Sequence, residues 1–452
     1  MVSMKRKIYS ELIKWKSSET KKPLMIMGAR QIGKSFIVDE FCKQEFQRVF
    51  TFNLFDRPDI VSLFKESIPT QEKMNKLELL LGLSLNEQST ILFFDEVQES
   101  EELISSLKFI AESNVNYRVI CAGSLLGVKI SRFKKSFPVG KVKLLHMYPM
   151  DFEEFLWAYG HEGLAEEIRA CAATNKSMVS ALHEMSMNLY RQYLCCGGMP
   201  EAIINMVTNE GNVLQFETTI LSDIITAYIA DMNKYVRSIS EANRIEACYR
   251  SIPAQLGNKS HKFQYSKVRK GARWRDFESA IDWLSASGMV VSCYMVGRPR
   301  SPLNAAESDG FFKLFLSDSG LLANLMGVRL SSIILDEPFE QKGILVENYV
   351  ATQLQLLLPR LHYWRSDNSA EIDFVLDTRD GVIPVEVKAG TNKRSPSLEL
   401  YTNKFEPAYS IKIIQRNFGF ENNIKTMPLY AAFTLKDLLC RTVPASKADV
   451  GI

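Results

Sequence analysis

A short stretch near the N-terminus has the residue types and spacing of a phosphate-binding loop. "GARQIGKS" matches the pattern GxxxxGK[ST], follows an apolar strand-like run and precedes a helix-like one. Its glycines let backbone N–H groups face phosphate oxygens, Lys34 can reach the β- and γ-phosphates, and the Ser35 hydroxyl can bind Mg²⁺. The loop therefore predicts binding of ATP with Mg²⁺. The residues expected to contact the nucleotide are Gly28, Ala29, Arg30, Gln31, Ile32, Gly33, Lys34, Ser35 and Phe36.

Two later strand ends supply the groups that hydrolysis of ATP would need. The apolar run "ILFFDE" ends in Asp95 and Glu96, and "VICAGS" ends in Ser124. Asp95 would bind Mg²⁺, directly or through water, and Glu96 would orient and deprotonate the attacking water. Ser124 could sense the γ-phosphate, although a small residue that simply ends a strand explains it equally well. The predicted catalytic residues of an ATPase are thus Lys34, Glu96 and Ser124.

A second group of acids lies towards the C-terminus. Residues 370–390, "AEIDFVLDTRDGVIPVEVKAG", read as two strands joined at "TRDG". Successive strand residues point to opposite faces, so Asp373, Glu386 and Lys388 can converge opposite the apolar face. Glu347 lies in the helical run "GILVENYVATQL", where a lone carboxylate among apolar neighbours is costly unless it is paired or binds metal. The order Glu…Asp…Glu-x-Lys resembles the signature of the PD-(D/E)xK nuclease fold.

That resemblance implies a particular chemistry. Glu347, Asp373 and Glu386 would hold a second Mg²⁺ or Mn²⁺, which polarises the scissile phosphate and activates a bound water. Lys388 would orient that water or stabilise the developing charge. Two alternatives stay open, because fold does not fix function. The domain could be a docking platform without activity, or the acids could be the solvated side of an ordinary hairpin.

A basic segment lies in the middle of the chain. Between residues 262 and 275, Lys and Arg are interleaved with aromatic residues, and no acid is present. A helical run then leads through Gly288 to a strand, an order that resembles a winged helix. Such a module would contact DNA phosphates through its basic residues. The alternative is a packing module whose charges are solvated. The residues expected to contact nucleic acid are Lys267, Arg269, Lys270 and Arg273.

Hydrophobic patterning predicts the elements that position these groups. Strand-like and helix-like runs alternate over residues 23–130, which is typical of a parallel sheet covered on both faces. The pattern is helical over residues 151–237. After a Pro- and Ser-rich loop, the last block, from residue 311, reads as helix 342–358, strand 362–366, the hairpin, and strands 410–417 and 427–433.

Composition narrows the class of protein. The 452 residues are 46% hydrophobic and 24% charged, with a net charge of +3, so nucleic-acid binding would have to come from local patches. The eight Cys form no CxxC pair, and the five His are dispersed, which gives no zinc framework. No apolar run reaches the roughly 18 residues of a membrane span, and the N-terminus lacks the apolar core of a signal peptide. We therefore expect a cytoplasmic protein without membrane association.

Several motifs together resemble one family of proteins. "GARQIGKS", "FFDEVQ", "AGSLLG", "YPMDFEEF" and "YLCCGGMPEAI" look like those of prokaryotic AAA-type ATPases similar to the signal-transduction NTPases, which carry an uncharacterised C-terminal domain. The resemblance spans about residues 20–430. It implies that Gly198 and Pro200 touch the nucleotide from the side of a helical lid, although a helix-ending turn also explains them. Arg118, Arg132 and Arg191 are candidates for a transition-state arginine, and nothing in the sequence selects one of them.

Taken together, the sequence predicts an α/β protein with an AAA-like phosphate-loop ATPase core and further modules. The expected segments are the ATPase core 1–160, a helical lid 161–237, a winged-helix-like module 238–297 and a PD-(D/E)xK-like α/β domain 298–452. The first functional hypothesis is an ATP-controlled, Mg²⁺-dependent enzyme that processes DNA. The alternative is an ATP-gated switch that binds a partner, either another protein or a second copy of itself, through an inactive nuclease-like platform.

Overall fold

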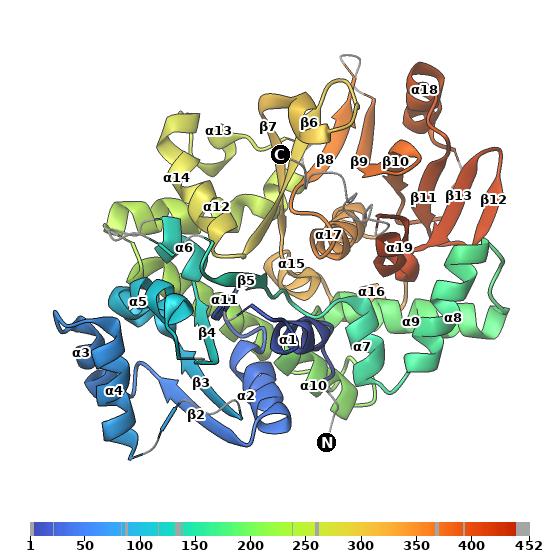
Figure 1. The fold of residues 1–452 in the computed structure, drawn as a ribbon. Coiled ribbons are helices and arrows are strands. Elements are labelled where there is room, and N and C mark those ends of the chain that lie inside the picture. The colour runs from blue at the N-terminus through green and yellow to red at the C-terminus, as the bar shows by residue number, and fades with distance from the viewer. Residues whose placement is uncertain are drawn as a thin grey trace, which may run out of the picture. The chain divides into compact units, whose positions relative to one another are not determined.

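The computed structural model divides the chain into two compact units. The N-terminal unit comprises Lys5–Pro149 with Ser279–Met289, and the C-terminal unit comprises Met1–Met4, Met150–Glu278 and Val290–Ile452. Figure 1 follows the chain by colour through both units. The structure describes residues 4–20, 22–82, 84–85, 89–115, 117–131, 137–138, 140–236, 238–257, 262–366, 370–391 and 394–439.

The N-terminal unit is built on a five-stranded sheet in the order β2-β3-β4-β1-β5. All neighbouring strands are parallel, so their carboxyl ends meet at one edge. The strands are β1 (Leu24–Gly28), β2 (Arg48–Asn53), β3 (Thr90–Asp95), β4 (Val119–Ser124) and β5 (Lys143–His146). β1 and β4 are buried along almost their whole length, as expected of central parallel strands.

Helices cover both faces of this sheet. Apolar residues of α3, α4 and α5 form one cluster with alternate residues of β2, β3 and β4, while α2 packs against the other face of these strands (Figure 1). The helices are α1 (Ile8–Lys16), α2 (Lys34–Glu45), α3 (Pro58–Lys65), α4 (Thr70–Leu81), η1 (Val97–Glu99), α5 (Glu101–Glu112) and α6 (Leu126–Ser131). The predicted alternation of strands and helices is confirmed. α1 and the short β5, whose residues alternate between exposed and half-buried, were not predicted.

The first half of the C-terminal unit is helical, as the pattern over residues 151–237 predicted. Its helices are α7 (Phe152–Ala158), α8 (Glu162–Thr174), α9 (Ser180–Cys196), α10 (Pro200–Thr208), α11 (Thr219–Lys234), α12 (Ile239–Leu256), α13 (Tyr265–Val268) and α14 (Trp274–Ala286), which ends in the N-terminal unit. α7 begins with a capping box in which Asp151 accepts from the Glu154 N–H at 2.8 Å.

The second half of this unit is a mixed eight-stranded sheet in the order β12-β13-β11-β10-β9-β8-β6-β7. Its strands are β6 (Val290–Val296), β7 (Glu307–Leu316), β8 (Leu361–Arg365), β9 (Glu371–Thr378), β10 (Gly381–Val387), β11 (Ser410–Ile414), β12 (Gly419–Glu421) and β13 (Ile424–Pro428). β9 and β10 form the predicted hairpin, with Phe374 opposite Val385. The pairing of β8 with β9 shifts register between His362 and Trp364, which interrupts the alternation of faces beside Asp373.

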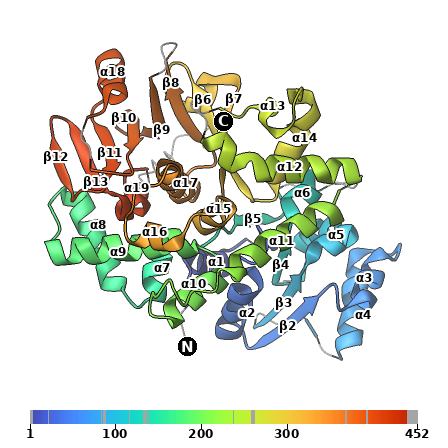
Figure 2. The ribbon, with the colours of Figure 1, turned by 180° about the vertical axis from the view of Figure 1, so that it is seen from behind.

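Helices cover this sheet too. α17 contacts β6, β7, β8 and β10, and α18 contacts β9 and β10. In both views α8 and α9 lie beside the β12–β13 edge, where the Lys425 ammonium donates to the Ala172 carbonyl at 2.6 Å (Figures 1 and 2). The remaining helices are η2 (Leu303–Ala306), α15 (Ser319–Leu325), α16 (Leu330–Ile334), α17 (Lys342–Gln355), α18 (Pro396–Phe405), η3 (Leu429–Thr434) and α19 (Leu435–Leu439).

One sequence expectation for this unit is wrong in detail, and one strand was missed. The predicted strand 427–433 ends at Pro428, and its apolar remainder is the buried turn of helix η3. β7 was not predicted, because the segment before residue 311 reads as a loop. The predicted boundary between residues 297 and 298 falls between β6 and β7, two strands that pair with each other while β6 also pairs with β8. The winged-helix module and the four-segment division remain predictions.

Two further features bear on function only by what they exclude. Among the described residues, no helix is both long and apolar enough to cross a membrane.

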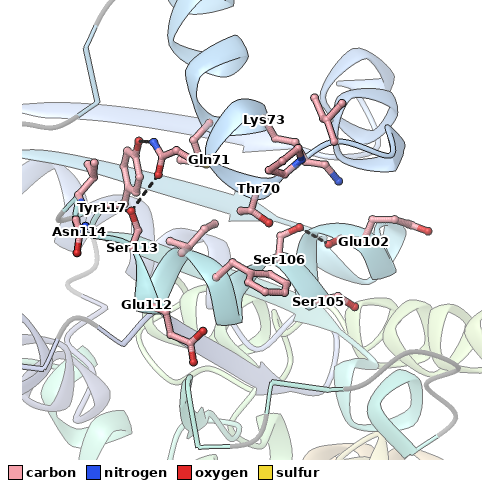
Figure 3. A pocket seen from close by; sticks show the side chains of 16 residues that line it. Thr70, Gln71, Lys73, Glu102, Ser105, Ser106, Glu112, Ser113, Asn114 and Tyr117 are labelled. Atoms are coloured by element: carbon pink, nitrogen blue, oxygen red, sulfur yellow. Dashed lines mark hydrogen bonds between the residues drawn. The ribbon is translucent and has the colours of Figure 1, made fainter.

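A pocket of about 780 Å³ opens between α4 and α5 in the N-terminal unit, and Figure 3 shows polar side chains such as Gln71 and Ser106 on its wall beside aliphatic ones. None of the predicted site residues lines it, so it belongs to neither candidate site.

Candidate functional site

The phosphate loop connects the end of β1 to the start of α2, as predicted. Gly28 has φ +151° and Gly33, which precedes α2, has φ +88°, both in the range that favours glycine. A Cβ atom on Gly28 would lie 2.1 Å from the Met147 carbonyl oxygen. A side chain at this position would therefore displace either the loop or the segment after β5.

Lys34 points back into its own loop. Its side chain is buried, and the ammonium donates to the carbonyl oxygens of Gly28 at 3.0 Å and Ala29 at 2.6 Å. These two contacts keep the ammonium close to the backbone of the loop. The Lys34 ammonium would therefore lie close to phosphate oxygens bound by the loop.

Asp95 at the end of β3 and Ser35 in the first turn of α2 meet although they are 60 residues apart in the chain. β3 ends at Asp95, whose carboxylate hydrogen-bonds with the Ser35 side chain. Burial raises the pKa of Asp95, and the hydrogen bonds from Ser35 and the Glu96 backbone, with the charge of Lys34, partly oppose this rise. A hard carboxylate beside a hydroxyl and a phosphate-binding loop is a donor set that fits Mg²⁺ together with a bound nucleotide.

Glu96 belongs to a small hydrogen-bonded group at the same edge of the sheet. It has φ +53°, and its Oε2 accepts from the Gln98 amide and from the Ser124 hydroxyl, the latter at 3.3 Å. Ser124 ends β4 directly opposite Gly28 of β1. The structure thus brings Lys34, Ser35, Asp95, Glu96 and Ser124 to one edge. Sequence reasoning missed Gln98, although the motif "FFDEVQ" contains it.

The three candidates for a transition-state arginine lie in different parts of the chain. Arg118 precedes β4 and so lies at the opposite end of this strand from Ser124, with its guanidinium over the Trp15 ring at 5.9 Å. It is therefore excluded as an arginine acting within its own chain on the phosphates. Arg191 lies in the C-terminal unit, 3.6 Å from Asp336. Arg132 lies outside the described residues.

The turn containing Gly198 is fixed by contacts inside the C-terminal unit. The Gly198 N–H donates to Asp318 at 2.6 Å, and the Gly198 carbonyl accepts from Met150 N–H at 2.7 Å. A Cβ at Gly198 would lie 2.0 Å from the Met150 carbonyl oxygen, and Pro200 begins α10. Packing therefore accounts for both residues. Their expected contact with nucleotide remains a prediction.

The basic segment is exposed. All four predicted nucleic-acid residues present exposed side chains around α13 and the start of α14, and among the described residues none of these side chains forms an ion pair. Trp274 is 54% exposed at the first position of α14. Unpaired cations beside an exposed aromatic ring are what a nucleic-acid contact requires. The four residues are Lys267, Arg269, Lys270 and Arg273.

The C-terminal acids are brought only partly together. Burial raises the pKa of Asp373 to about 8, and the charge of the nearby Glu347 adds to this rise. Glu386 is instead paired with Lys388 at 2.7 Å, and Lys388 in turn lies within electrostatic reach of Asp373 and Glu347. Glu386 is only 2% exposed whereas the Lys388 side chain is 42% exposed, so this face of the hairpin is only partly solvated.

A lysine that sequence reasoning missed lies among these acids. The Lys313 ammonium, from β7, is 2.8 Å from Glu347 and 2.6 Å from Glu371. Among the described residues, no group of three or more His, Cys, Asp or Glu side chains is arranged to hold a metal ion. The predicted ligands Glu347, Asp373 and Glu386 therefore do not fit a divalent ion in this arrangement. A signal existed in the sequence, since Lys313 interrupts the apolar run "FFKLFL".

Comparison with protein families supports the predicted AAA-type ATPase. Residues 20–156 match a family described as an AAA domain, residues 187–332 match a domain of unknown function (DUF8612), and residues 342–432 match another (DUF4143). No curated protein matches the chain.

Solved structures resemble the chain only distantly. A Walker-type ATPase of Pyrococcus abyssi is 15% identical, with 72% of this chain and 96% of that chain covered and a TM-score of 0.46. The Aeropyrum pernix ORC2 protein is 14% identical, with 73% of this chain and 92% of that chain covered and a TM-score of 0.35. The Thermotoga maritima RuvB Holliday junction branch migration motor is 12% identical, with 66% of this chain and 90% of that chain covered and a TM-score of 0.28. At such scores these likenesses do not bear on what this chain does.

Proposed function

We propose that the chain binds ATP with Mg²⁺ at the phosphate loop and hydrolyses it. The observation that carries the proposal is the meeting of Lys34, Ser35, Asp95 and Glu96 at one edge of a parallel sheet, from two separate segments of the chain. The AAA-domain match over residues 20–156 supports it.

Each residue has a distinct task in this proposal. The loop N–H groups and Lys34 bind and orient the phosphates, and Ser35 with Asp95 would hold Mg²⁺, which neutralises phosphate charge when bound. Glu96 orients the attacking water and accepts its proton. Gln98 and Ser124 donate to the Glu96 carboxylate and so keep it directed towards the phosphate loop.

Binding of ATP is tested by Lys34→Ala. Loss of the charge on the β- and γ-phosphates is expected to raise the Kd for ATP by about 10- to 100-fold, the size of one or two charge-assisted hydrogen bonds. The measurement is titration calorimetry with ATP and Mg²⁺. Lys43→Ala, on the exposed side of the same helix and paired with Asp39, is the matched control and is expected to keep the parent Kd. Equal Kd values for the two variants would remove the phosphate loop from the proposal.

A second candidate function, contact with nucleic acid, rests on the exposed basic segment. We infer that its cations bind DNA phosphates without reading sequence. Changing Arg269, Lys270 and Arg273 to Ala is expected to weaken DNA binding equally across sequences. It should also flatten the log–log dependence on salt by about 0.9 per lost contact. The measurement is fluorescence anisotropy across a salt series.

The matched control changes three other exposed cations, Lys176, Arg329 and Lys436, to Ala, which removes the same total charge. An equal loss of affinity in both triple variants would show a general effect of net charge and would contradict a binding segment. No change in either variant would leave the basic segment with a packing role only.

Of the two hypotheses for the C-terminal domain, the arrangement favours the inactive platform. Cutting of DNA by a PD-(D/E)xK-like site depends on a divalent ion, and the predicted ligands do not fit one. We therefore infer that residues 298–452 contribute a binding surface rather than a metal-dependent reaction.

A further inference from the structure

Lys313 is a buried cation in a place where the sequence predicts a metal. Its side chain is 2% exposed, it starts from β7, and it passes over the Tyr363 ring, with 4.9 Å from Nζ to the ring centroid. At its end the ammonium contacts one carboxylate from α17, Glu347, and one from β9, Glu371. It therefore links two elements that carry the acids of the predicted site.

The ammonium is surrounded by acids in the folded protein. Nζ lies 2.8 Å from Glu347 and 2.6 Å from Glu371, and Asp373 lies within electrostatic reach. Three acids and one cation thus form a single electrostatic group, and the cation has direct contacts to two of them.

Each predicted metal ligand already has a partner from the chain. Glu347 accepts from Lys313 at 2.8 Å, Glu386 accepts from Lys388 at 2.7 Å, and Oδ2 of Asp373 accepts from the Val387 N–H at 2.7 Å. A divalent ion needs oxygen ligands at roughly 2.0–2.6 Å. An ion bound to Glu347 would lie within a few ångströms of the Lys313 ammonium, where the like charges repel strongly in a buried site.

We propose that the Lys313 ammonium takes the place of a divalent cation among the acids of the C-terminal domain, so that the chain itself offsets part of the charge of this cluster and the cluster binds no metal. The proposal goes beyond ATP binding and hydrolysis, and it is independent of them because every residue involved lies in the C-terminal unit.

The test is a count of bound Mn²⁺ by electron paramagnetic resonance on the full chain without nucleotide. All proteins carry Asp95→Asn, which removes the metal ligand of the phosphate-loop site. The protein with native Lys313 is expected to bind no Mn²⁺ at the cluster. Lys313→Met is expected to gain one Mn²⁺ per chain, because Glu347 and Glu371 lose their counter-ion. Adding Asp373→Asn to Lys313→Met should abolish that gain.

Lys425→Met is the matched control. Lys425 is also buried on this sheet, but its ammonium donates to the Ala172 carbonyl rather than to carboxylates, so its removal is expected to create no Mn²⁺ site. If Lys313→Met folds poorly, Lys313→Met/Glu371→Gln removes one charge of each sign and is expected to gain the same Mn²⁺. Two results would overturn the proposal. One is a Mn²⁺ ion bound with Lys313 in place and lost on Asp373→Asn. The other is a folded Lys313 variant that gains none.

Discussion

The Glu96→Gln protein is expected to bind ATP as the parent does and to hydrolyse it about 10²- to 10⁴-fold more slowly, the range of a lost general base. Glutamine keeps the shape of the side chain and can still meet the Ser124 hydroxyl, but it cannot accept a proton from water. Single-turnover hydrolysis and the Kd for ATP, measured on the same preparation, separate loss of chemistry from loss of binding.

Glu99→Gln is the matched control for this prediction. Glu99 ends the short helix η1, whose N-cap is Glu96, and Glu99 is not one of the residues of the proposed ATP site, so hydrolysis is expected to continue at the parent rate. If Glu96→Gln also hydrolyses ATP at the parent rate, Glu96 is not the base, and its contacts with Gln98 and Ser124 serve only to shape the edge of the sheet.

Lys313→Met is expected to lower the free energy of unfolding of the C-terminal unit by about 3 to 5 kcal/mol, the cost of leaving buried charges without a partner. The carboxylates of Glu347 and Glu371 are only 16% and 12% exposed, so water can replace the ammonium only in part. Adding Glu371→Gln should recover part of the loss, because one of the two uncompensated charges is removed. The measurement is urea unfolding, with each transition fitted separately.

Lys425→Met provides the comparison for stability as well. Its loss leaves a carbonyl rather than two carboxylates without a donor, so the expected cost is smaller, about 1 to 3 kcal/mol. If Lys313→Met costs no more than Lys425→Met, or if Glu371→Gln recovers nothing, the acids around Lys313 do not depend on it for their charge balance.

The phosphate loop could be predicted because its residues are consecutive. Gly28 and Gly33 have the backbone angles that the motif requires, and Lys34 and Ser35 directly follow Gly33. The loop can therefore be recognised without knowledge of contacts between distant parts of the chain. The acidic pair was also predictable. Parallel strands that alternate with helices bring their carboxyl ends to one edge, and Asp95 ends such a strand.

The basic segment was likewise found from local sequence. The charges of Arg269, Lys270 and Arg273 are exposed, as a run of basic residues without acids suggests. What such a run cannot show is whether its neighbouring strands form a separate module. β6 pairs with β8 across a large sequence separation, and pairing of that kind leaves no local signal.

The sequence by itself determined the phosphate loop, the acidic pair after β3, the hairpin and the identity of the C-terminal acids, because these follow from adjacent residues and from the periodicity of single elements. Only the tertiary structure decided what those acids do. Lys313 interrupts the apolar run "FFKLFL", which suggests a buried lysine, but β7 was not predicted and the run does not show that Lys313 lies beside Glu347 and Glu371. Charge balance in a buried cluster depends on every group within a few ångströms, whatever its position in the chain. For that reason, one lysine from another strand changes a predicted metal site into an internal ion network.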